Sequence, residues 1–445
     1  MEALKEQVEK DSAGEEAGYP RWVRVNAVKS SVEEQLDTTF ARYSRALSLH
    51  EVINGEGGSS ARHVFIDPHV PNLLAVTQGI DLTKTEAYAA GKIILQDKAS
   101  CFPAYLLNPG PEDGDAIDAC AAPGNKTTHL AAILHSHQPD FKSEPQIIYA
   151  FEKDSRRART LEKMVQVAGS TKVTRIAPGQ DFLQVDPLQD KYKSVGALLL
   201  DPSCSGSGIV GRDSMPEVHL PEAPGGGSKN KEGQEKNQKG QGRKRKHAEV
   251  EEKKQDVLVD DDGNEVVVKS EKDLQARLDA LSSFQLILLL HAFKFPAARK
   301  ITYSTCSVHA EENESVVMQA LQSDIAKQRG WRIMRRDEQV TGMREWPVRG
   351  IPDACAGDKE VGEGCIRSYK DDGHGVMGFF VAGFVRDETE EAAGEDGDGP
   401  YMRDENGAIL RDVTGMPVLK STGEPVELVP RSDEEEEEEW AGFGD

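Results

Sequence analysis

Two cysteines stand where apolar, strand-like runs turn polar, and both are candidates for covalent chemistry. Cys306 follows the β-rich run at residues 301–305, and Cys204 follows an apolar run that ends at Leu200. A thiol at the carboxyl end of a strand can face the crevice in which open α/β sheets bind their ligands. Either thiol, taken alone, could equally be a small buried apolar residue, which is a common fate of cysteine.

The neighbours of Cys204 make a packing role a poor explanation for it. The string is Leu200-Asp-Pro-Ser-Cys-Ser-Gly-Ser-Gly208, in which an acid and a proline separate the apolar run from a Gly/Ser loop. Asp201 ends a strand-like run beside the expected crevice, so it could hold the polar edge of a base. Cys204 is then a second candidate thiol at the same site.

A loop of small residues follows an earlier strand-like run and leads into a helix-like one. Its sequence is Asp118-Ala-Cys-Ala-Ala-Pro-Gly-Asn-Lys-Thr127. Small residues let the backbone approach a ligand closely, and Gly124 lacks a Cβ that would block the approach. Aligned on Lys126, a GxxxxGK[ST] phosphate loop would need glycine where Cys120 and Asn125 stand, so a nucleoside triphosphate fits poorly. A non-phosphorylated nucleoside cofactor fits better.

Glu152 ends the next strand-like run. A carboxylate at this place can accept hydrogen bonds from both hydroxyl groups of a ribose. It could also be an ordinary loop carboxylate, although its position favours the functional interpretation.

Strand-like and helix-like runs alternate between these motifs, which predicts βαβ units and a mainly parallel sheet. We expect an α/β catalytic domain over residues 101–386. A small α+β domain is expected over residues 19–100, after a flexible N-terminus at 1–18. In that small domain, Arg21, Trp22 and Arg24 could contact RNA by stacking and phosphate pairing, or could simply belong to a packing domain.

Two segments lack the pattern of a folded chain. Residues 212–270 have no apolar periodicity, which predicts a disordered insertion. Its basic run at 243–246 could be a nuclear localisation signal, an RNA-contacting patch or a solvated charge cluster. Residues 387–445 are acidic and are also expected to be disordered, serving solubility or contact with a basic partner.

The net charge of −23 does not by itself exclude a nucleic-acid partner. The acidic tail accounts for −16 of it and the rest of the chain for −7, so a nucleic-acid site must be a local patch. Six cysteines without a CxxC pair indicate a reducing compartment and no zinc site. No apolar run approaches the length of a membrane span and no signal-peptide core is present, so we expect a soluble cytosolic or nuclear protein.

Together, the motifs at 118–127, 200–208 and 304–306 resemble those of the Sun-family RNA cytosine carbon-5 methyltransferases, over roughly residues 20–211 and 271–386. They are most similar to the eukaryotic branch that methylates large-subunit ribosomal RNA. Asn125 replaces a second glycine, and Asp-Pro-Ser-Cys replaces the commoner Asp-Ala-Pro-Cys. The resemblance implies a Rossmann-like domain that uses S-adenosylmethionine. It also implies a monomer that acts on ribosomal RNA of the pre-ribosomal large subunit in the nucleolus, without a metal or a membrane.

The resemblance also implies roles for individual residues. Cys306 would be the nucleophile and Cys204 would assist product release. From the chemistry of the reaction, we expect Asp201 to stabilise the protonated ring edge and Lys126 to favour the Cys306 thiolate. Glu152, often aspartate in relatives, would bind the ribose, with Arg157 nearby and Asp181 beside the adenine. The cofactor residues implied are Cys120, Ala121, Ala122, Pro123, Gly124, Asn125, Lys126, Glu152, Arg157, Asp181 and Asp201.

Cytosine chemistry agrees with a thiol nucleophile. Carbon-5 of cytosine is too weakly nucleophilic to take a methyl group directly, and addition of a thiolate to carbon-6 activates it. The base must leave its stack to reach such a site, so single-stranded or remodelled RNA is expected. The alternatives are a ribosome-assembly scaffold without catalysis and a methyltransferase for another substrate.

Overall fold

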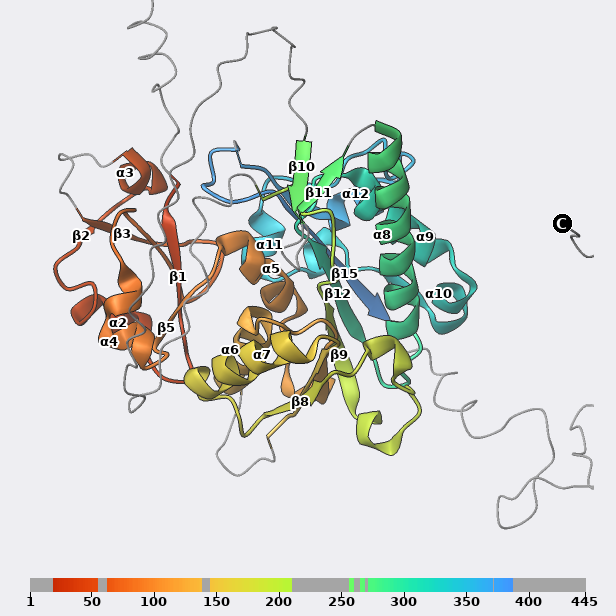
Figure 1. Ribbon diagram of the computed structural model, residues 1–445, viewed down its shortest axis with the longest axis horizontal. Helices are drawn as coiled ribbons and strands as arrows, with labels where there is room; N and C mark the ends of the chain where they lie inside the picture. Colours follow the sequence, from red (N-terminus) through yellow and green to blue (C-terminus); the bar gives the residue numbers. More distant parts are fainter. Residues whose placement is uncertain are drawn as a thin grey trace, which may run out of the picture. The chain divides into compact units, whose positions relative to one another are not determined.

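The computed structural model describes residues 19–54, 62–137, 145–209, 256–259, 265–268, 271–370 and 372–386, and Figure 1 shows their elements. The predictions for the N-terminus at 1–18, for the basic run at 243–246 and for the tail at 387–445 lie outside these residues. They stay predictions.

The first domain is a five-stranded sheet with short helices. The strand order is β2 (Ser44–Arg45), β3 (His63–Ile66), β4 (Leu73–Val76), β1 (Arg21–Val25) and β5 (Ile93–Leu95). The helices are α2 (Val32–Asp37), α3 (Leu49–Asn54), the 3-10 turn η1 (Leu82–Lys84) and α4 (Glu86–Ala89). The Ser31 hydroxyl accepts a hydrogen bond from the Glu34 amide and caps α2. The small α+β domain expected from the sequence is confirmed.

Two of the three side chains considered for RNA contact in this domain are buried. Trp22 is 2% exposed and Arg24 is 1% exposed. The Trp22 ring belongs to an apolar cluster and its Nε1 donates to the Gly375 carbonyl. For Trp22 and Arg24 the structure therefore contradicts direct stacking on RNA and supports packing. Arg21 is half-buried, so it keeps a solvent-facing part.

The large sheet has the order β13 (Trp331–Ile333), β15 (Phe379–Arg386), β12 (Lys300–Thr305), β9 (Val195–Leu200), β6 (Asp115–Asp118), β7 (Ile148–Glu152) and β8 (Thr174–Pro178), with β14 (Ile366–Ser368) also paired to β15. The run from β12 to β8 is parallel throughout. Strand β15 is antiparallel to β12, β13 and β14. This confirms the mainly parallel, Rossmann-like sheet that the alternating pattern predicts.

Helices cover both faces of the large sheet (Figure 1), and the central strands are apolar for that reason. In β9, Ala197 and Leu199 pack against α5 (Lys98–Leu107) and α6 (Asn125–His137). Leu198 and Leu200 point to the other face, against α8 (Glu271–Ala292) and α9 (Glu314–Gln322). The remaining helices and 3-10 turns are α7 (Ser155–Ala168), α10 (Asp324–Arg329), α11 (Thr341–Glu345), α12 (Lys359–Gly364), η2 (Pro111–Asp113), η3 (Phe182–Gln184), η4 (Asp190–Tyr192), η6 (Ala310–Glu312) and η7 (Arg336–Glu338).

Part of the insertion at residues 212–270 forms regular structure. Strands β10 (Asp256–Val259) and β11 (Glu265–Val268) pair antiparallel within the segment 212–270, where the sequence predicts disorder. Both strands are rich in valine, which favours β structure, and this local signal is diluted by the polar segment around it. The prediction is wrong for this hairpin. Among the described residues, no helix is long and apolar enough to cross a membrane.

The loops after β9 and β12 are joined by a buried carboxylate. Glu312 is 0% exposed and accepts hydrogen bonds from the Ser205 amide (2.9 Å), the Ser205 hydroxyl (2.5 Å) and the Gln285 side chain (3.1 Å). Gly208 donates its amide to the Cys306 carbonyl at 2.9 Å, and a Cβ on Gly208 would lie 2.2 Å from the Gly378 carbonyl oxygen. Glycine is therefore needed at position 208, because the Gly/Ser loop lies there in close contact with the Cys306 segment and with Gly378.

Replacing Glu312 by alanine should destabilise the chain strongly. The change leaves the buried donors of Ser205 and Gln285 without their acceptor, so we expect the free energy of unfolding to fall by about 3 kcal/mol. Chemical denaturation measures this difference. The matched control is Glu311→Ala, at the partly exposed neighbouring position, which should change stability by no more than about 0.5 kcal/mol. Equal effects of the two changes would contradict the role of Glu312.

Candidate active site

The candidate site residues follow the sheet order along one edge of the large sheet. Because the strands from β12 to β8 are parallel, their carboxyl ends meet at the same edge. Cys306 follows β12, the segment 201–204 follows β9, and Cys120 follows β6. Glu152 ends β7 and Asp181 comes after β8. The chain reverses its direction of strand addition between β6 and β9, which is the usual place for ligand binding in such sheets.

The two cysteines predicted to work together lie in direct contact. Cys204 Sγ and Cys306 Sγ are 3.0 Å apart, with 102 residues between their positions in the chain. Cys204 is 1% exposed, whereas Cys306 is partly exposed. A thiol on Cys204 can donate to a thiolate on Cys306, and of the two residues Cys306 is the one with solvent-facing surface.

Asp201 and Lys126 form an ion pair beside the cysteines. Lys126 Nζ lies 2.6 Å from Asp201 Oδ2, and the Ser304 hydroxyl donates to Asp201 Oδ1 at 2.6 Å. Burial lowers the pKa of Lys126, but Asp201 and then Cys306 raise it by more, so the net shift is upward. Lys126 is therefore a cation within the field of the Cys306 sulfur, as the sequence-based expectation requires.

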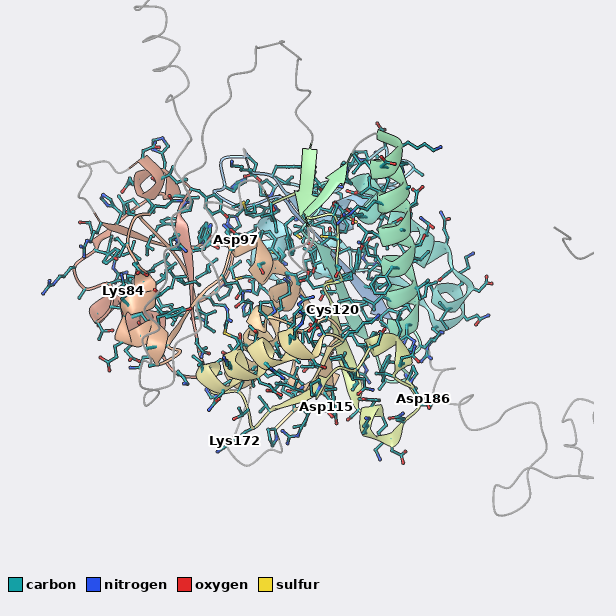
Figure 2. The ribbon with its side chains drawn as sticks, in the orientation of Figure 1. Lys84, Asp97, Asp115, Cys120, Lys172 and Asp186 are labelled. Atoms are coloured by element: carbon teal, nitrogen blue, oxygen red, sulfur yellow. The ribbon has the colours of Figure 1, made fainter. Side chains whose placement is uncertain are left out.

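Cys120, labelled in Figure 2, is the third cysteine at this edge of the sheet. Burial raises the pKa of its thiol well above the ordinary value, and the carboxylates of Asp118, Asp201 and Glu152 add to the effect. A thiol held protonated is a weak nucleophile. Its chemistry thus differs from that expected of Cys306, and it is suited to lining a pocket.

The small-residue loop between β6 and α6 comprises residues 119–124, and Gly124 has a role that the sequence did not indicate. Its φ is +111°, a conformation that other residues rarely adopt. A Cβ at this position would lie 3.0 Å from Met164 Cβ and 3.1 Å from Leu161 Cδ1 of α7. Gly124 therefore allows α7 to pack closely against the loop, in addition to any contact with a ligand.

The structure brings the predicted cofactor residues together around this loop. Glu152 is 6% exposed, and its carboxylate accepts from the amides of Ala122 (3.2 Å) and Asp154 (2.8 Å). Arg157 Nη2 donates to the Ala122 carbonyl at 3.2 Å. Asp181 caps η3 through the Leu183 amide (3.0 Å) and lies 3.2 Å from Lys153 Nζ.

Other residues that support the site were missed in the sequence. Besides Glu312, the Asn313 amide group bridges Thr305 Oγ1 (2.5 Å) and the Ser307 carbonyl (2.9 Å), on either side of Cys306. Glu314 forms a buried, bidentate pair with Arg367, whose Nη1 donates to the Val308 carbonyl at 2.9 Å. The run Glu311-Glu-Asn-Glu314 directly after a candidate cysteine was the available signal, because acids in an apolar setting need partners.

Among the described residues, no group of three or more His, Cys, Asp or Glu side chains is arranged to hold a metal ion. The site consists instead of two thiols, an ion pair and a loop of small residues.

Two family models match this chain. One describes the 16S rRNA methyltransferases RsmB/F and matches residues 104–226. The other describes the ferredoxin-like domain of NOL1/NOP2/Sun domain family member 5 and matches residues 19–96, the domain that carries the five-stranded sheet.

A solved structure supports the fold. The methyltransferase homolog protein from Pyrococcus horikoshii aligns with a TM-score of 0.52 at 19% identity, over 82% of this chain and 86% of that one.

Three curated relatives match most of the chain. The 25S rRNA (cytosine-C(5))-methyltransferase rcm1 of Schizosaccharomyces pombe is 37% identical over 84% of this chain and 64% of its own length. The 28S rRNA (cytosine-C(5))-methyltransferase of Mus musculus is 34% identical over 86% and 65%. This chain thus spans somewhat less than two thirds of those two proteins. The 26S rRNA (cytosine-C(5))-methyltransferase nsun-5 of Caenorhabditis elegans is 30% identical over 87% of this chain and 72% of its own length. This chain belongs to the Sun family of rRNA cytosine-C5 methyltransferases.

Proposed function

We propose that this chain uses S-adenosylmethionine to methylate carbon-5 of a cytosine in large-subunit ribosomal RNA, through a covalent bond between Cys306 and carbon-6. The observation that carries the proposal is the contact of two sulfurs, 3.0 Å apart, beside the Lys126–Asp201 ion pair. The named relatives act on 25S, 28S and 26S rRNA, which supports a large-subunit substrate. A monomer in the nucleolus, bound to the pre-ribosomal large subunit, is part of the same proposal.

The residues around the small-residue loop fit the methyl donor. Asp118 is fully buried, its Oδ2 accepts from the Thr127 hydroxyl at 2.7 Å, and its Oδ1 has no partner among the described residues. An acceptor left open in this way suits the cationic methionine part of the donor. Glu152, at the end of β7, offers acceptors for the ribose hydroxyls. When bound, the donor supplies a methyl group on a positively charged sulfur.

The first chemical step is the attack of Cys306 on the base. The thiolate, favoured by the nearby charge of Lys126, forms a bond to carbon-6 of cytosine. The π electrons of the C5–C6 bond then make carbon-5 nucleophilic, and the ring edge at N3 gains electron density. N3 takes up a proton from solvent as this density builds, and Asp201, held by Lys126 and Ser304, would accept a hydrogen bond from the protonated N3 edge.

The later steps transfer the methyl group and release the product. Carbon-5 takes the methyl group, while the electron pair of the broken bond stays on the sulfur of the donor. Cys204, as a thiolate once its own proton has passed to solvent, then removes the proton from carbon-5. The N3 edge returns its proton to solvent, the C5–C6 double bond forms again, and Cys306 leaves as a thiolate. The contact between the two sulfurs supports Cys204 as the base and Cys306 as the nucleophile, because the base must act close to the carbon that Cys306 has attacked.

A scaffold without catalysis is the less favoured alternative. A scaffold does not need two thiols in contact, or a Lys126–Asp201 ion pair beside them. A methyltransferase for a different RNA would share every residue described above. The identity of the RNA is therefore tested separately, by comparing unmodified large-subunit rRNA with other RNAs as acceptors of label from S-adenosylmethionine. If folded protein transferred no label to any RNA, the proposal that this chain methylates RNA would be contradicted.

The two cysteines should differ in how they affect the adduct. In Cys204→Ala, the bond between Cys306 and RNA forms but is not resolved, so we expect a covalent RNA–protein species that survives denaturing electrophoresis. In Cys306→Ala, and in the double variant, this species should be absent and methylation should be lost. A stable adduct in Cys306→Ala would reverse the two roles.

Glu152 should control affinity for the methyl donor. In Glu152→Ala, we expect the Kd for S-adenosylmethionine to rise by about tenfold or more, because loss of a charged acceptor costs about 1.5–3 kcal/mol. Calorimetric titration measures the change. Glu152→Asp keeps a carboxylate and should retain most of the affinity, and Glu162→Gln, on the exposed face of α7, should change nothing. An unchanged Kd in Glu152→Ala would exclude Glu152 as a ribose ligand.

Asp118 should make stability depend on pH. Burial raises the pKa of Asp118 to about 7, despite the hydrogen bond from Thr127. Because an unfolded aspartate ionises near pH 3.9, the folded state loses stability as pH rises between about 4 and 7. We therefore expect Asp118→Asn to stabilise the donor-free protein by about 3 kcal/mol more at pH 7.5 than at pH 4.5. Denaturation curves at both pH values, with Glu162→Gln as control, measure this; a gain independent of pH would contradict it.

A further inference from the structure

A cavity lies between the two domains, along the side of α6. Its volume is about 120 Å³, and its lining includes Arg24 of β1, Asn72 before β4, Tyr105 of α5 and His129 of α6. Pro71 and Ser136, also in the lining, are exposed, so the cavity opens to solvent at that end. It is called the Arg24 cavity below.

The buried guanidinium of Arg24 lacks an anionic partner. Its Nε donates to Gln96 Oε1 at 2.7 Å, and its Nη2 donates to Thr128 Oγ1 at 2.9 Å and to the Asn125 carbonyl at 3.2 Å. All three partners are uncharged. Its Nη1 has no partner among the described residues. A charge that is 1% exposed is normally paired, because burying it unpaired costs several kcal/mol.

A second unpartnered group lines the same cavity. His129 is 5% exposed, and its Nδ1 has no partner among the described residues. Burial lowers the pKa of His129 well below its ordinary value, and the charges of Arg24 and Lys126 lower it further. The neutral ring can donate one N–H bond. The described residues that line the cavity include no aspartate or glutamate, so its polar groups suit an anion and repel a cation.

We infer that the Arg24 cavity binds a single phosphate group between Arg24 Nη1 and His129. The guanidinium is the side chain best matched to the oxygens of a phosphate. A volume of about 120 Å³ has room for several water molecules and therefore for a tetrahedral anion. The phosphate comes from inorganic phosphate or from the RNA, and the second source rests on the proposed function.

This site would link the domains to the donor loop. Arg24 belongs to the first domain, and its Nη2 contacts the Asn125 carbonyl in the first turn of α6, next to Lys126. A phosphate on Nη1 would neutralise the buried charge and fix the guanidinium between the two domains. Binding in the cavity is thus expected to stabilise the arrangement of β1 against α6.

The test uses the full chain with inorganic phosphate and without RNA or S-adenosylmethionine, so its outcome does not depend on the proposed function. Binding is followed by calorimetry and by NMR of labelled histidine, against chloride at equal ionic strength. We expect saturation at millimolar phosphate and an increase in the pKa of His129, because a nearby anion favours the charged ring. Absence of any change at His129 would mean that the cavity holds only water and would overturn the inference.

Two variants identify the site. Arg24→Gln removes the charge, and Ala132→Leu fills the cavity while keeping Arg24, since Ala132 is part of the lining. Each should raise the Kd for phosphate by at least about tenfold. The control His135→Leu places the same side chain on the exposed face of α6 and should bind phosphate normally. Because Arg24→Gln removes bonds between the domains, Ala132→Leu decides the test if Arg24→Gln unfolds. Normal binding by folded Ala132→Leu would overturn the inference.

A last comparison separates the two sources. If RNA supplies the phosphate, inorganic phosphate at constant ionic strength should weaken RNA binding by the unmodified chain, and should not affect it in Ala132→Leu. If the ligand is inorganic phosphate alone, RNA affinity should be the same with and without it. Both results retain the phosphate site and differ only in its source.

Discussion

The parallel pairing of β9 with β12 is the constraint on which the candidate site depends. The pairing runs from Lys300 opposite Ala197 to Tyr303 opposite Leu200, so the two strands end side by side. Because β9 is apolar and buried on both faces, an alternation of apolar and polar residues does not set this register, and the backbone pairing with β12 holds the two strand ends level. Cys306 and Cys204 meet for that reason, and Glu312 then holds the loops that carry them.

Electrostatics gives chemically similar residues different tasks. Three cysteines lie at the edge of the sheet. Burial and neighbouring carboxylates raise the pKa of Cys120 and keep its thiol protonated. Cys204 is buried, in contact with Cys306. Cys306 is partly exposed and lies in the field of the Lys126 cation. Glu314 and Arg367 form a buried ion pair, whereas the hydrogen-bond acceptors of the buried Arg24 guanidinium are uncharged.

Much of the fold could be predicted from the sequence, because its signals are local. The apolar run that ends at Leu200 and the alternation of strand-like and helix-like runs indicated the parallel sheet that β6, β7, β8, β9 and β12 form. The hairpin of β10 and β11 was missed, since two short valine-rich runs lie inside a long polar segment. The sequence left open whether Trp22 and Arg24 contact RNA or pack, because a local pattern does not indicate which distant segments will cover a strand.

The sequence by itself determined the reactive groups and their places at strand ends: the thiols of Cys204 and Cys306, the acid Asp201 and the loop around Gly124. Spacing along the chain left either thiol free to attack. Only the tertiary structure decided that the two sulfurs touch, that Cys306 is the more exposed, and that Gly124 makes room for α7. The physical reason is that strand order and loop packing arise from contacts between distant segments, which a local pattern of residues does not encode.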